Sequence, residues 1–444
     1  MHGLAAHGLW FDETLSVSSA CGSILQRPFG HGPAFTPADF WAGNSVAGVV
    51  EADVAQDGGN GIVYHLLLHA WVQLAGTSDF AVRLPSLLAG VLAVAGTHAL
   101  ALRLANPGVA WWATFLAAAH PLLIRLSQEA RPYSLATALG VLSTLLLVRW
   151  LEGQGRTRHL VAYALSATAL VLTHYLATAV LIAHAAFVLL GPVPKRRRLP
   201  VVGALMGAAL LAALWLPLGG GRGLEVVGAR DRDYRARAMR SPDRFAQGAG
   251  ARTLGAGIVQ MTAALSGDTL QDWGIHLSRI STVLVVPGVL IAAAWRRRTS
   301  GEGAPGAVGL LTVLSVASVA VAGILALISG HVVSFQPRYA AFVAPYAMIL
   351  LAVGITAGGT VTRVALAGHL AVVMASVLSV YADAPVHRPR NAFPTRAAAA
   401  LGAREGTVVH RNWPEARMVN LYLPAGPTPS QRVRGSAASL GRVR

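Results

Sequence analysis

Acidic residues and cysteine are scarce in this chain, and each scarcity excludes a class of protein. Its 444 residues include only 19 aspartates and glutamates, and charged residues of all kinds make up 12% of the sequence. Soluble domains carry about 25% charged residues, so an ordinary soluble enzyme is excluded. The single cysteine, Cys21, excludes an intrachain disulfide and a cysteine-based metal centre.

Lysine is also nearly absent, since only Lys195 is present and the net charge of +17 comes almost entirely from arginine. Arginine is suited to binding phosphate with two parallel hydrogen bonds. In a basic membrane protein this charge favours anionic lipid as a partner over nucleic acid.

Long apolar runs dominate what is present, because 54% of the residues are hydrophobic and the mean hydropathy is +0.53. A helix needs roughly 20 apolar residues to cross a hydrocarbon core, and a chain in lipid must satisfy its backbone polar groups internally. We therefore predict an all-α polytopic membrane protein. Ten spans are expected, at 81–104, 108–125, 132–150, 159–173, 175–191, 200–218, 278–295, 306–329, 339–358 and 361–381.

Basic residues in short loops predict the orientation, because cytoplasmic loops are enriched in lysine and arginine. The basic residues at 149–158, 195–198 and 296–298 fall on one side with these spans. That side is assigned to the cytoplasm, which puts 1–80, the arginine-rich loop 219–277 and the tail after 381 outside. We expect a membrane domain at 1–381, an incomplete extracytoplasmic segment at 382–444 and a missing leading helix before Met1.

Under this topology the polar residues that could take part in catalysis or binding gather at the outer face. The pair Asp12-Glu13 offers a carboxylate that could deprotonate an acceptor hydroxyl, although acids also favour the first turn of a helix. In 61–76, His65, His69 and Gln73 recur every four residues and share one face of an amphipathic helix. That face either lines the substrate or packs with satisfied histidines.

Two further segments place arginine beside proline and tyrosine at the start of a span. Arg131, in SQEARPY, could clamp a phosphate, or it could form a structural pair with Glu129. Arg338, in FQPRY, repeats the layout, and interfacial arginine and tyrosine are also common anchors. The loop 219–277 is either a cover over the site or a solvated charge run. The histidines have no spacing typical of a helical zinc site.

Together these segments resemble a known family. The order of the outer Asp-Glu, GNGIVYHLLLHAWVQLAG, HPLLIRLSQEARPYSLA, THYLA and FQPRYAAFVAP is similar to integral-membrane glycosyltransferases of the GT-C class. The closest group is the glycosyltransferase family 39 type, which includes protein O-mannosyltransferases and the aminoarabinose transferase of lipid A. The resemblance covers about 1–350. It implies a GT-C-type helical bundle, with a partial α/β domain in the outer tail.

The resemblance also implies a reaction and a site. The reaction is inverting transfer of a sugar from a polyprenyl monophosphate to an acceptor at the outer face of the plasma membrane. Asp12 would be the base with Glu13 beside it, while Arg131, Glu129, Tyr133, Arg338 and Tyr339 would hold the lipid phosphate. The candidate substrate-lining residues are Asp57, Tyr64, His65, His69, Gln128 and His174.

Several points stay open at the level of sequence. The sugar is expected to be mannose-like, and the acceptor is a protein, a lipid or a glycan. No cofactor is required by the pattern, and a divalent metal is left open. The alternatives are a lipid or sugar transporter and a non-catalytic relative of the enzyme.

Overall fold

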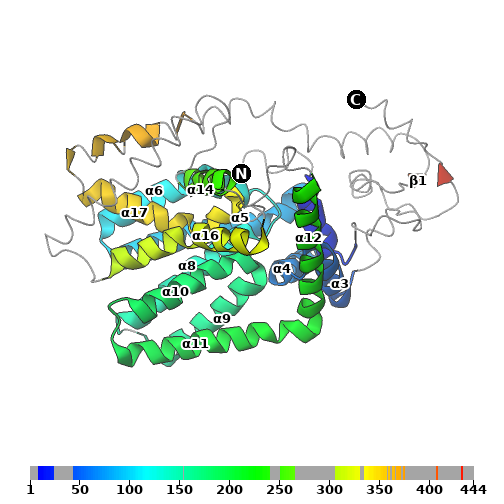
Figure 1. The fold of residues 1–444 in the computed structure, drawn as a ribbon, viewed down its shortest axis with the longest axis horizontal. Coiled ribbons are helices and arrows are strands. Elements are labelled where there is room, and N and C mark those ends of the chain that lie inside the picture. Colours follow the sequence, from blue (N-terminus) through cyan, green and yellow to red (C-terminus); the bar gives the residue numbers. More distant parts are fainter. Residues whose placement is uncertain are drawn as a thin grey trace.

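The computed structural model describes most of the chain up to residue 357 (Figure 1). The described residues are 9–24, 44–153, 155–240, 251–265, 306–330, 335–357, 359–360, 363–365, 367–371, 374–375, 407–408 and 432–433. The predicted span 278–295 lies outside these residues. Most of the predicted span 361–381 and of the segment 382–444 also lies outside them.

Within the described residues, three helices precede the first long span: α1 (Phe11–Ala20), α3 (Val46–Asp57) and α4 (Ile62–Ala75). Asp12 and Glu13 occupy the first turn of α1, so the acidic pair begins a helix and does not lie in an extended loop. The turn from α3 to α4 contains Gly58, Gly59 and Gly61, whose φ angles are 68°, 77° and 135°. Glycine adopts positive φ without steric cost, so this turn can fold α4 back against α3.

The described part of the chain next contains a series of apolar helices. These are α5 (Asp79–Leu104), α6 (Pro107–Ala119), α7 (Pro121–Ser127), α8 (Tyr133–Leu151), α9 (Thr157–Thr173), η1 (Tyr175–Ala177), α10 (Thr178–Leu190) and α11 (Lys195–Ala213). The predicted span 108–125 is broken at Pro121, since α6 and α7 meet at an angle of 59°. Proline explains the break, because it cannot donate the backbone hydrogen bond that a continuous helix needs.

After α11 the chain continues through η2 (Leu216–Gly220) into α12 (Gly221–Arg240) and α14 (Ala251–Leu265). The predicted outer loop 219–277 thus contains helices over 221–240 and 251–265, and its position outside the membrane stays a prediction. The described chain ends with α16 (Ala307–Ser329), η3 (Pro337–Phe342), α17 (Ala344–Ala357), and the short parallel strands β1 (Thr407–Val408) and β2 (Arg432–Val433).

The helical membrane class is confirmed by the described helices. Four helical stretches in the described residues are long and apolar enough to cross a membrane, or five if the bent pair α6–α7 counts as one span. The total of ten spans stays a prediction.

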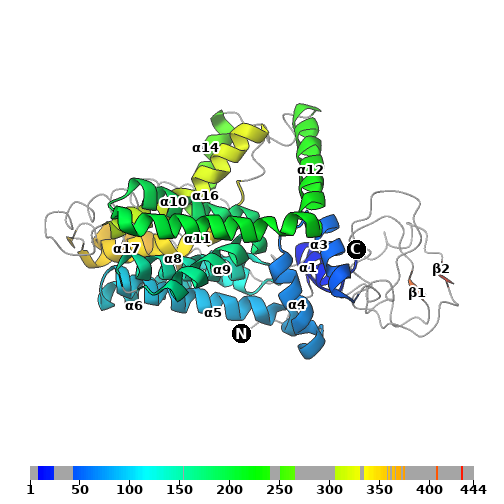
Figure 2. The same ribbon diagram turned by 90° about the horizontal axis from the view of Figure 1, so that it is seen from below.

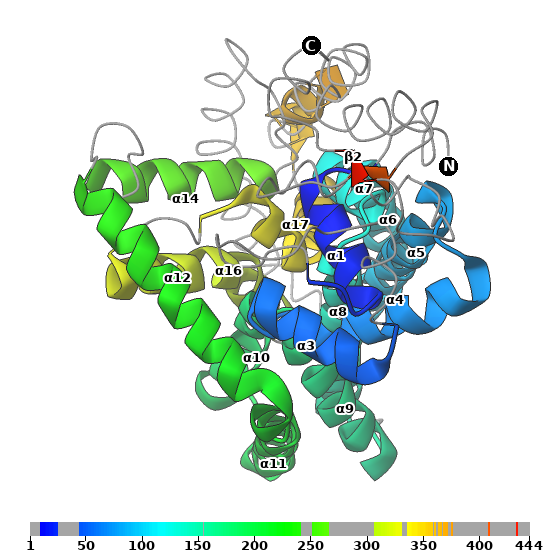
Figure 3. The same cartoon turned by 90° about the vertical axis from the view of Figure 1, so that its right-hand side faces the viewer.

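The long helices run side by side along the longest axis of the molecule, while α1, α3 and α4 pack together at one end (Figures 2 and 3). At that end α12 leaves the bundle steeply and contacts α3. The basic connections α8–α9 and α10–α11 lie at the opposite end, where the Trp150 indole donates to the Arg197 carbonyl at 3.3 Å. The candidate residues and the basic loops therefore occupy opposite ends of the bundle.

Candidate active site

Glu13 is a buried anchor of α1. Arg83 of α5 donates to both of its carboxylate oxygens at 2.7 Å, and the backbone N–H of Ala130 donates at 2.9 Å. The backbone N–H of Trp10 adds a fourth bond at 3.2 Å, and the Glu13 side chain is only 1% exposed. Both carboxylate oxygens are thus engaged by the protein, which suits Glu13 to fixing α1 against α5 and the 128–132 segment.

Asp12 points to a different set of partners. Its Oδ2 accepts a hydrogen bond from Arg338 Nη1 at 2.6 Å, and the two side chains are 21% and 28% exposed. Gln336 accepts from Arg338 Nε at 2.7 Å and so helps to orient the guanidinium. Asp12 therefore has a partly exposed carboxylate, and the cation beside it is supplied by a residue 326 positions later in the sequence.

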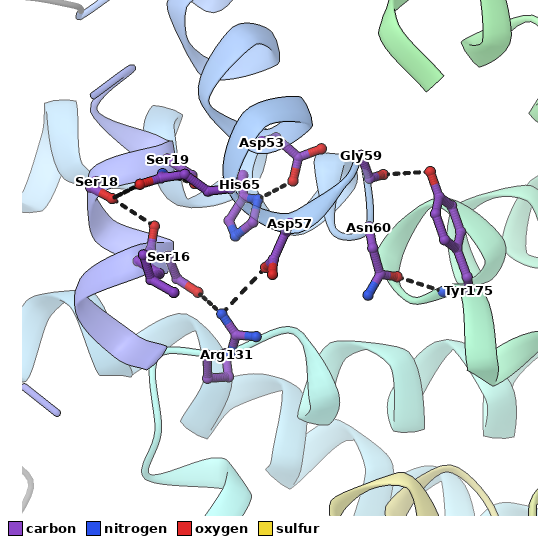
Figure 4. A network of polar contacts seen from close by, with 12 residues as sticks. Ser16, Ser18, Ser19, Asp53, Asp57, Gly59, Asn60, His65, Arg131 and Tyr175 are labelled. Carbon is purple, nitrogen blue, oxygen red and sulfur yellow. Dashed lines mark hydrogen bonds and ion pairs between the residues drawn. The ribbon is translucent and has the colours of Figure 1, made fainter. Parts of the chain in front are cut away.

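Arg131 lies between α1 and α3 in the segment before α8. Its Nη1 donates to the Asp12 carbonyl at 3.1 Å, to Ser16 Oγ at 2.9 Å and to Asp57 Oδ2 at 3.4 Å (Figure 4). Its Nε is buried without an acceptor among the described residues. A buried donor without an acceptor is costly, so this edge of the guanidinium is suited to an anionic ligand.

Four rings form an aromatic cluster beside the two arginines: Tyr133, His174, Tyr339 and Phe342. His174 is central, with ring centroids at 5.4 Å from Tyr133, 5.4 Å from Tyr339 and 4.9 Å from Phe342. The guanidinium carbons of Arg131 and Arg338 each lie 5.8 Å from the centroid of the Tyr133 ring. Tyr133 therefore holds both cations by cation–π attraction.

The α3–α4 unit supplies further polar groups. Asp57 ends α3 and faces Arg131, while His65 Nδ1 lies 2.7 Å from Oδ1 of the buried Asp53. Buried Gln56 donates to Ser18 and Ser19 of α1 at 3.1 and 2.8 Å, which ties α3 to α1. These contacts hold Asp57 beside Arg131.

The remaining predicted residues make contacts that stabilise the fold around the site. The Tyr64 hydroxyl lies 2.9 Å from Ser86 Oγ, which donates to the Arg131 carbonyl at 3.1 Å. His69 Nδ1 lies 2.7 Å from the Ala20 carbonyl. Glu129 accepts from Arg125 at 3.0 Å, so the expected pair with Arg131 is replaced by a pair with the preceding turn. Gln128 ends α7 and is half-buried.

Burial and charge shift the proton affinities of this cluster. Burial acts to raise the pKa of Asp57, but the attraction of Arg131, added to that of His65 and Arg230, outweighs it and the pKa lies below the usual range. Burial acts to lower the pKa of Arg131, but the attraction of Asp57, together with that of Tyr133 and Asp12, more than reverses this effect, so the guanidinium stays charged. Burial, helped by Arg131, lowers the pKa of His174 to about 3, which keeps this imidazole neutral. Within the described chain, no group of three or more His, Cys, Asp or Glu is placed to hold a metal ion.

Sequence reasoning missed three participants. Arg83 lies inside a predicted span, where an unpaired charge is energetically unfavourable. Its position could therefore have been used to predict that it pairs with an acidic residue. Ser16 and Asp53 gave no signal, because small polar residues in short helices are common and their partners are distant in sequence.

Comparison with known proteins adds to this geometry. Residues 60–218 match the family model described as dolichyl-phosphate-mannose-protein mannosyltransferase. The fold is similar to that of ArnT from Cupriavidus metallidurans in the apo state, with a TM-score of 0.51, 14% identity, and coverage of 88% of this chain and 68% of that chain. ArnT bound to undecaprenyl phosphate gives a TM-score of 0.51, 12% identity, and coverage of 93% and 74%.

An oligosaccharyltransferase from Archaeoglobus fulgidus, in complex with Zn and sulfate, gives a TM-score of 0.47, 12% identity, and coverage of 88% and 55%. No curated protein sequence matches the chain. The ArnT-like fold agrees with the expected GT-C-type helical architecture of a membrane protein. Over 60–218 the chain is similar to the mannosyltransferase family in particular.

Proposed function

We propose that this protein transfers a sugar from a polyprenyl monophosphate sugar to an acceptor hydroxyl at the extracytoplasmic face of the plasma membrane. The observation that carries the proposal is the convergence of one accessible carboxylate with two arginines. Asp12 contacts Arg338 through its side chain at 2.6 Å and Arg131 through its carbonyl at 3.1 Å. The family match to dolichyl-phosphate-mannose enzymes and the undecaprenyl phosphate in the ArnT complex support the donor class.

The arrangement supplies the two groups that an inverting transfer needs. The acceptor oxygen attacks the anomeric carbon, the bond from that carbon to the phosphate oxygen breaks, and polyprenyl phosphate leaves. Asp12 takes the acceptor proton. Arg131 and Arg338 stabilise the charge that grows on the departing phosphate, and such preorganised cations lower the barrier without moving during the reaction.

The Asp12–Arg338 pair also implies an order of binding, in which the donor binds before the acceptor. Without a ligand the carboxylate is held by the guanidinium, which competes with any acceptor hydroxyl. A lipid phosphate attracts Arg338 and weakens its hold on Asp12. Donor binding thus prepares the base before the acceptor arrives.

The opposite placement of the basic loops supports the sidedness. Basic connections mark the cytoplasmic side, and Trp150 and Arg197 join two of them at the far end of the bundle. The candidate site then opens toward the extracytoplasmic side, where a lipid-linked donor is the available activated sugar.

The test is a transfer assay with the purified protein in lipid nanodiscs. The substrates are undecaprenyl phosphate linked to labelled mannose or aminoarabinose, and the products are free undecaprenyl phosphate and a glycosylated acceptor or released sugar. We expect Asp12→Asn to lower turnover by roughly 10²- to 10⁴-fold, the range for loss of a general base. Arg131→Ala should lower it by roughly 10²- to 10³-fold.

Arg125→Ala is the matched control, since Arg125 is 70% exposed and the ion pair that it forms with the described residues is with Glu129 in the same turn. It should change turnover by less than about twofold. If labelled lipid crosses the bilayer without cleavage of the sugar–phosphate bond, the protein is a transporter. Tight binding of undecaprenyl phosphate with no turnover of either donor by the wild type would identify a non-catalytic relative.

A further inference from the structure

The carboxyl end of α3 carries an unfavourable charge. Asp57 is the last residue of this helix, and the last turn contains no basic residue. A carboxylate at this end is repelled by the negative end of the helix dipole. Asp53 lies one turn earlier, and carboxylates four residues apart on a helix repel each other. The positive charge that stabilises Asp57 therefore has to come from other elements.

Arg131 supplies one such charge, and α12 supplies another. Arg230 of α12 is half-buried, and its Nη2 donates a hydrogen bond to the carbonyl of Gln56, the residue before Asp57. This carbonyl is one of the last four in α3, which have no acceptor role within the helix. Burial raises the pKa of Asp57, and Arg131 and Arg230 are among the groups that lower it. Arg230 thus acts on the carboxylate and on the end of the helix.

Close packing of α12 on the turn between α3 and α4 fixes this contact. Gly223, Val227 and Arg230 recur at helical spacing and share one face of α12. A Cβ atom built at Gly223 would collide with the carbonyl oxygen of Gly58, and one built at Gly58 would lie 2.6 Å from Val227 Cγ2. Glycine at both positions lets the two backbones approach closely, so that Arg230 reaches the end of α3. Figure 3 shows α12 reaching α3 at this end of the bundle.

A second contact joins the same two helices farther from Asp57. Arg222 donates to both carboxylate oxygens of Glu51, at 3.0 and 2.7 Å, and both side chains are more than half exposed. Glu51 precedes Asp57 by six residues, which is nearly two turns of helix. This ion pair holds α12 against α3 without contacting the candidate site. It therefore allows the docking of α12 to be separated from the charge of Arg230.

The charges of the candidate site explain why a further cation matters. Arg131 pairs with Asp57 at 3.4 Å and Arg338 pairs with Asp12 at 2.6 Å, so each of these arginines is matched by an acid. A cluster with matched charges attracts an anionic phosphate less than a cluster with excess positive charge does. Arg230 donates to a neutral carbonyl, so its charge can offset that of Asp57.

We propose that α12 belongs to the donor site, because Arg230 offsets the charge of Asp57 and so leaves Arg131 able to attract the donor phosphate. This inference rests on the proposed function and gives the arginine-rich helix a role in affinity for the lipid phosphate. The Nε of Arg131 is buried without an acceptor among the described residues, and this is the edge that the phosphate meets. Arg230 is a positioning residue, since it acts through Asp57 and Arg131.

The test measures binding of undecaprenyl phosphate to the full chain in phosphatidylcholine nanodiscs, whose lipid carries no net charge. Arg230→Gln should raise Kd about tenfold, within the range for coupled charges of one network. Arg230→Lys keeps the charge and should stay within about threefold of the wild type. Arg222→Gln is the matched control, because it removes an exposed ion pair of α12 and leaves Arg230 in place, and it should change Kd by less than about twofold.

Removal of the acid gives a test that a loss of folding cannot imitate. Asp57→Asn removes a negative charge, and the amide oxygen can still accept the hydrogen bond from Arg131 Nη1. Alone, this change should tighten binding about fivefold. Combined with Arg230→Gln, it should return Kd to within about threefold of the wild type, because the net charge is restored. A role of Arg230 in docking alone predicts no such rescue.

Three results would overturn the inference: wild-type affinity in Arg230→Gln, an equal loss of affinity in Arg222→Gln, or a loss in Arg230→Gln that Asp57→Asn does not relieve. Weaker binding in Asp57→Asn alone would also contradict it. If the wild type binds undecaprenyl phosphate but cleaves neither the mannose nor the aminoarabinose donor, the proposed transfer is wrong, and the affinities of the variants still decide the role of Arg230. Absence of binding in the wild type would overturn both.

Discussion

Loss of the carboxylate charge should weaken the docking of α1 strongly at Glu13 and only slightly at the neighbouring Asp12. Glu13 accepts four hydrogen bonds, two of them from Arg83, and the two side chains are 1% and 5% exposed. Glu13→Gln leaves Arg83 buried without its counter-ion. Breaking a buried pair in this way costs about 3–5 kcal/mol, and we take about 3 kcal/mol because glutamine keeps part of the hydrogen bonding.

Cys21 provides a built-in probe of this loss. It is the only cysteine in the chain, lies at the end of α1 and is 2% exposed. Burial raises the pKa of its thiol to about 12, and the thiolate is the reactive form, so maleimide labels it only when α1 undocks. Since each 1.4 kcal/mol is a factor of ten, Glu13→Gln should speed labelling by roughly a hundredfold.

Asp12→Asn is the matched control for this measurement. The Asp12–Arg338 pair is about a quarter exposed, and exposed pairs contribute up to about 1 kcal/mol, so labelling should change by less than about fivefold while transfer collapses. Equal labelling of Cys21 in Glu13→Gln and the wild type would refute the assignment of Glu13 as an anchor. Loss of sugar transfer in Glu13→Gln with unchanged labelling of Cys21 would indicate that Glu13 takes part in catalysis.

Two further predictions concern buried histidines. His184 lies 2.9 Å from Thr144 Oγ1 and 3.1 Å from the Tyr163 hydroxyl. In His184→Leu, Thr144 keeps its bonds to Gly140 and Tyr346, but the buried Tyr163 hydroxyl loses the partner that the described residues give it. This loss should cost about 1–3 kcal/mol, seen as a lower melting temperature in nanodiscs, and an unchanged melting temperature would contradict the role of His184. His174 has a pKa lowered to about 3, so the unfolded state binds more protons below about pH 6.5. Its stabilising effect is complete above that pH and is lost as the pH falls toward 3, with a slope of at most about 1.4 kcal/mol per pH unit. His174→Phe should flatten the unfolding free energy between pH 6 and 4, and an equally steep acid loss in that variant would contradict it.

The membrane class and the main helices could be predicted from hydrophobic pattern. The expected span 81–104 corresponds to α5, 132–150 to α8, and 306–329 to α16. A long apolar run has few alternatives, because backbone polar groups in lipid must be satisfied within the helix. The same reasoning did not predict that the charged segment 221–240 forms the helix α12. A high content of charged residues indicates exposure to solvent and does not exclude a helix.

The candidate site could be predicted only as a set of residue types. Arg131, Arg338 and Asp12 were selected by composition and order, but nothing local assigned Glu13 to Arg83 or Asp12 to Arg338. These partners are 70 and 326 residues apart in sequence, and pairings over such separations depend on how the helices pack. Glu129 illustrates the limit, since its expected partner Arg131 lies two residues away and its actual partner is Arg125.

The sequence by itself determined that this chain lies in a membrane, that its helices run where the apolar stretches are long, and that its few acids and its arginines are the groups available for a polar site. Only the tertiary structure decided that Asp12 remains accessible and that Glu13 is buried in an ion pair that fixes α1. Asp12 and Glu13 are adjacent, and on a helix adjacent side chains point about 100° apart. Packing against α5 buries Glu13 and leaves Asp12 partly exposed beside Arg338.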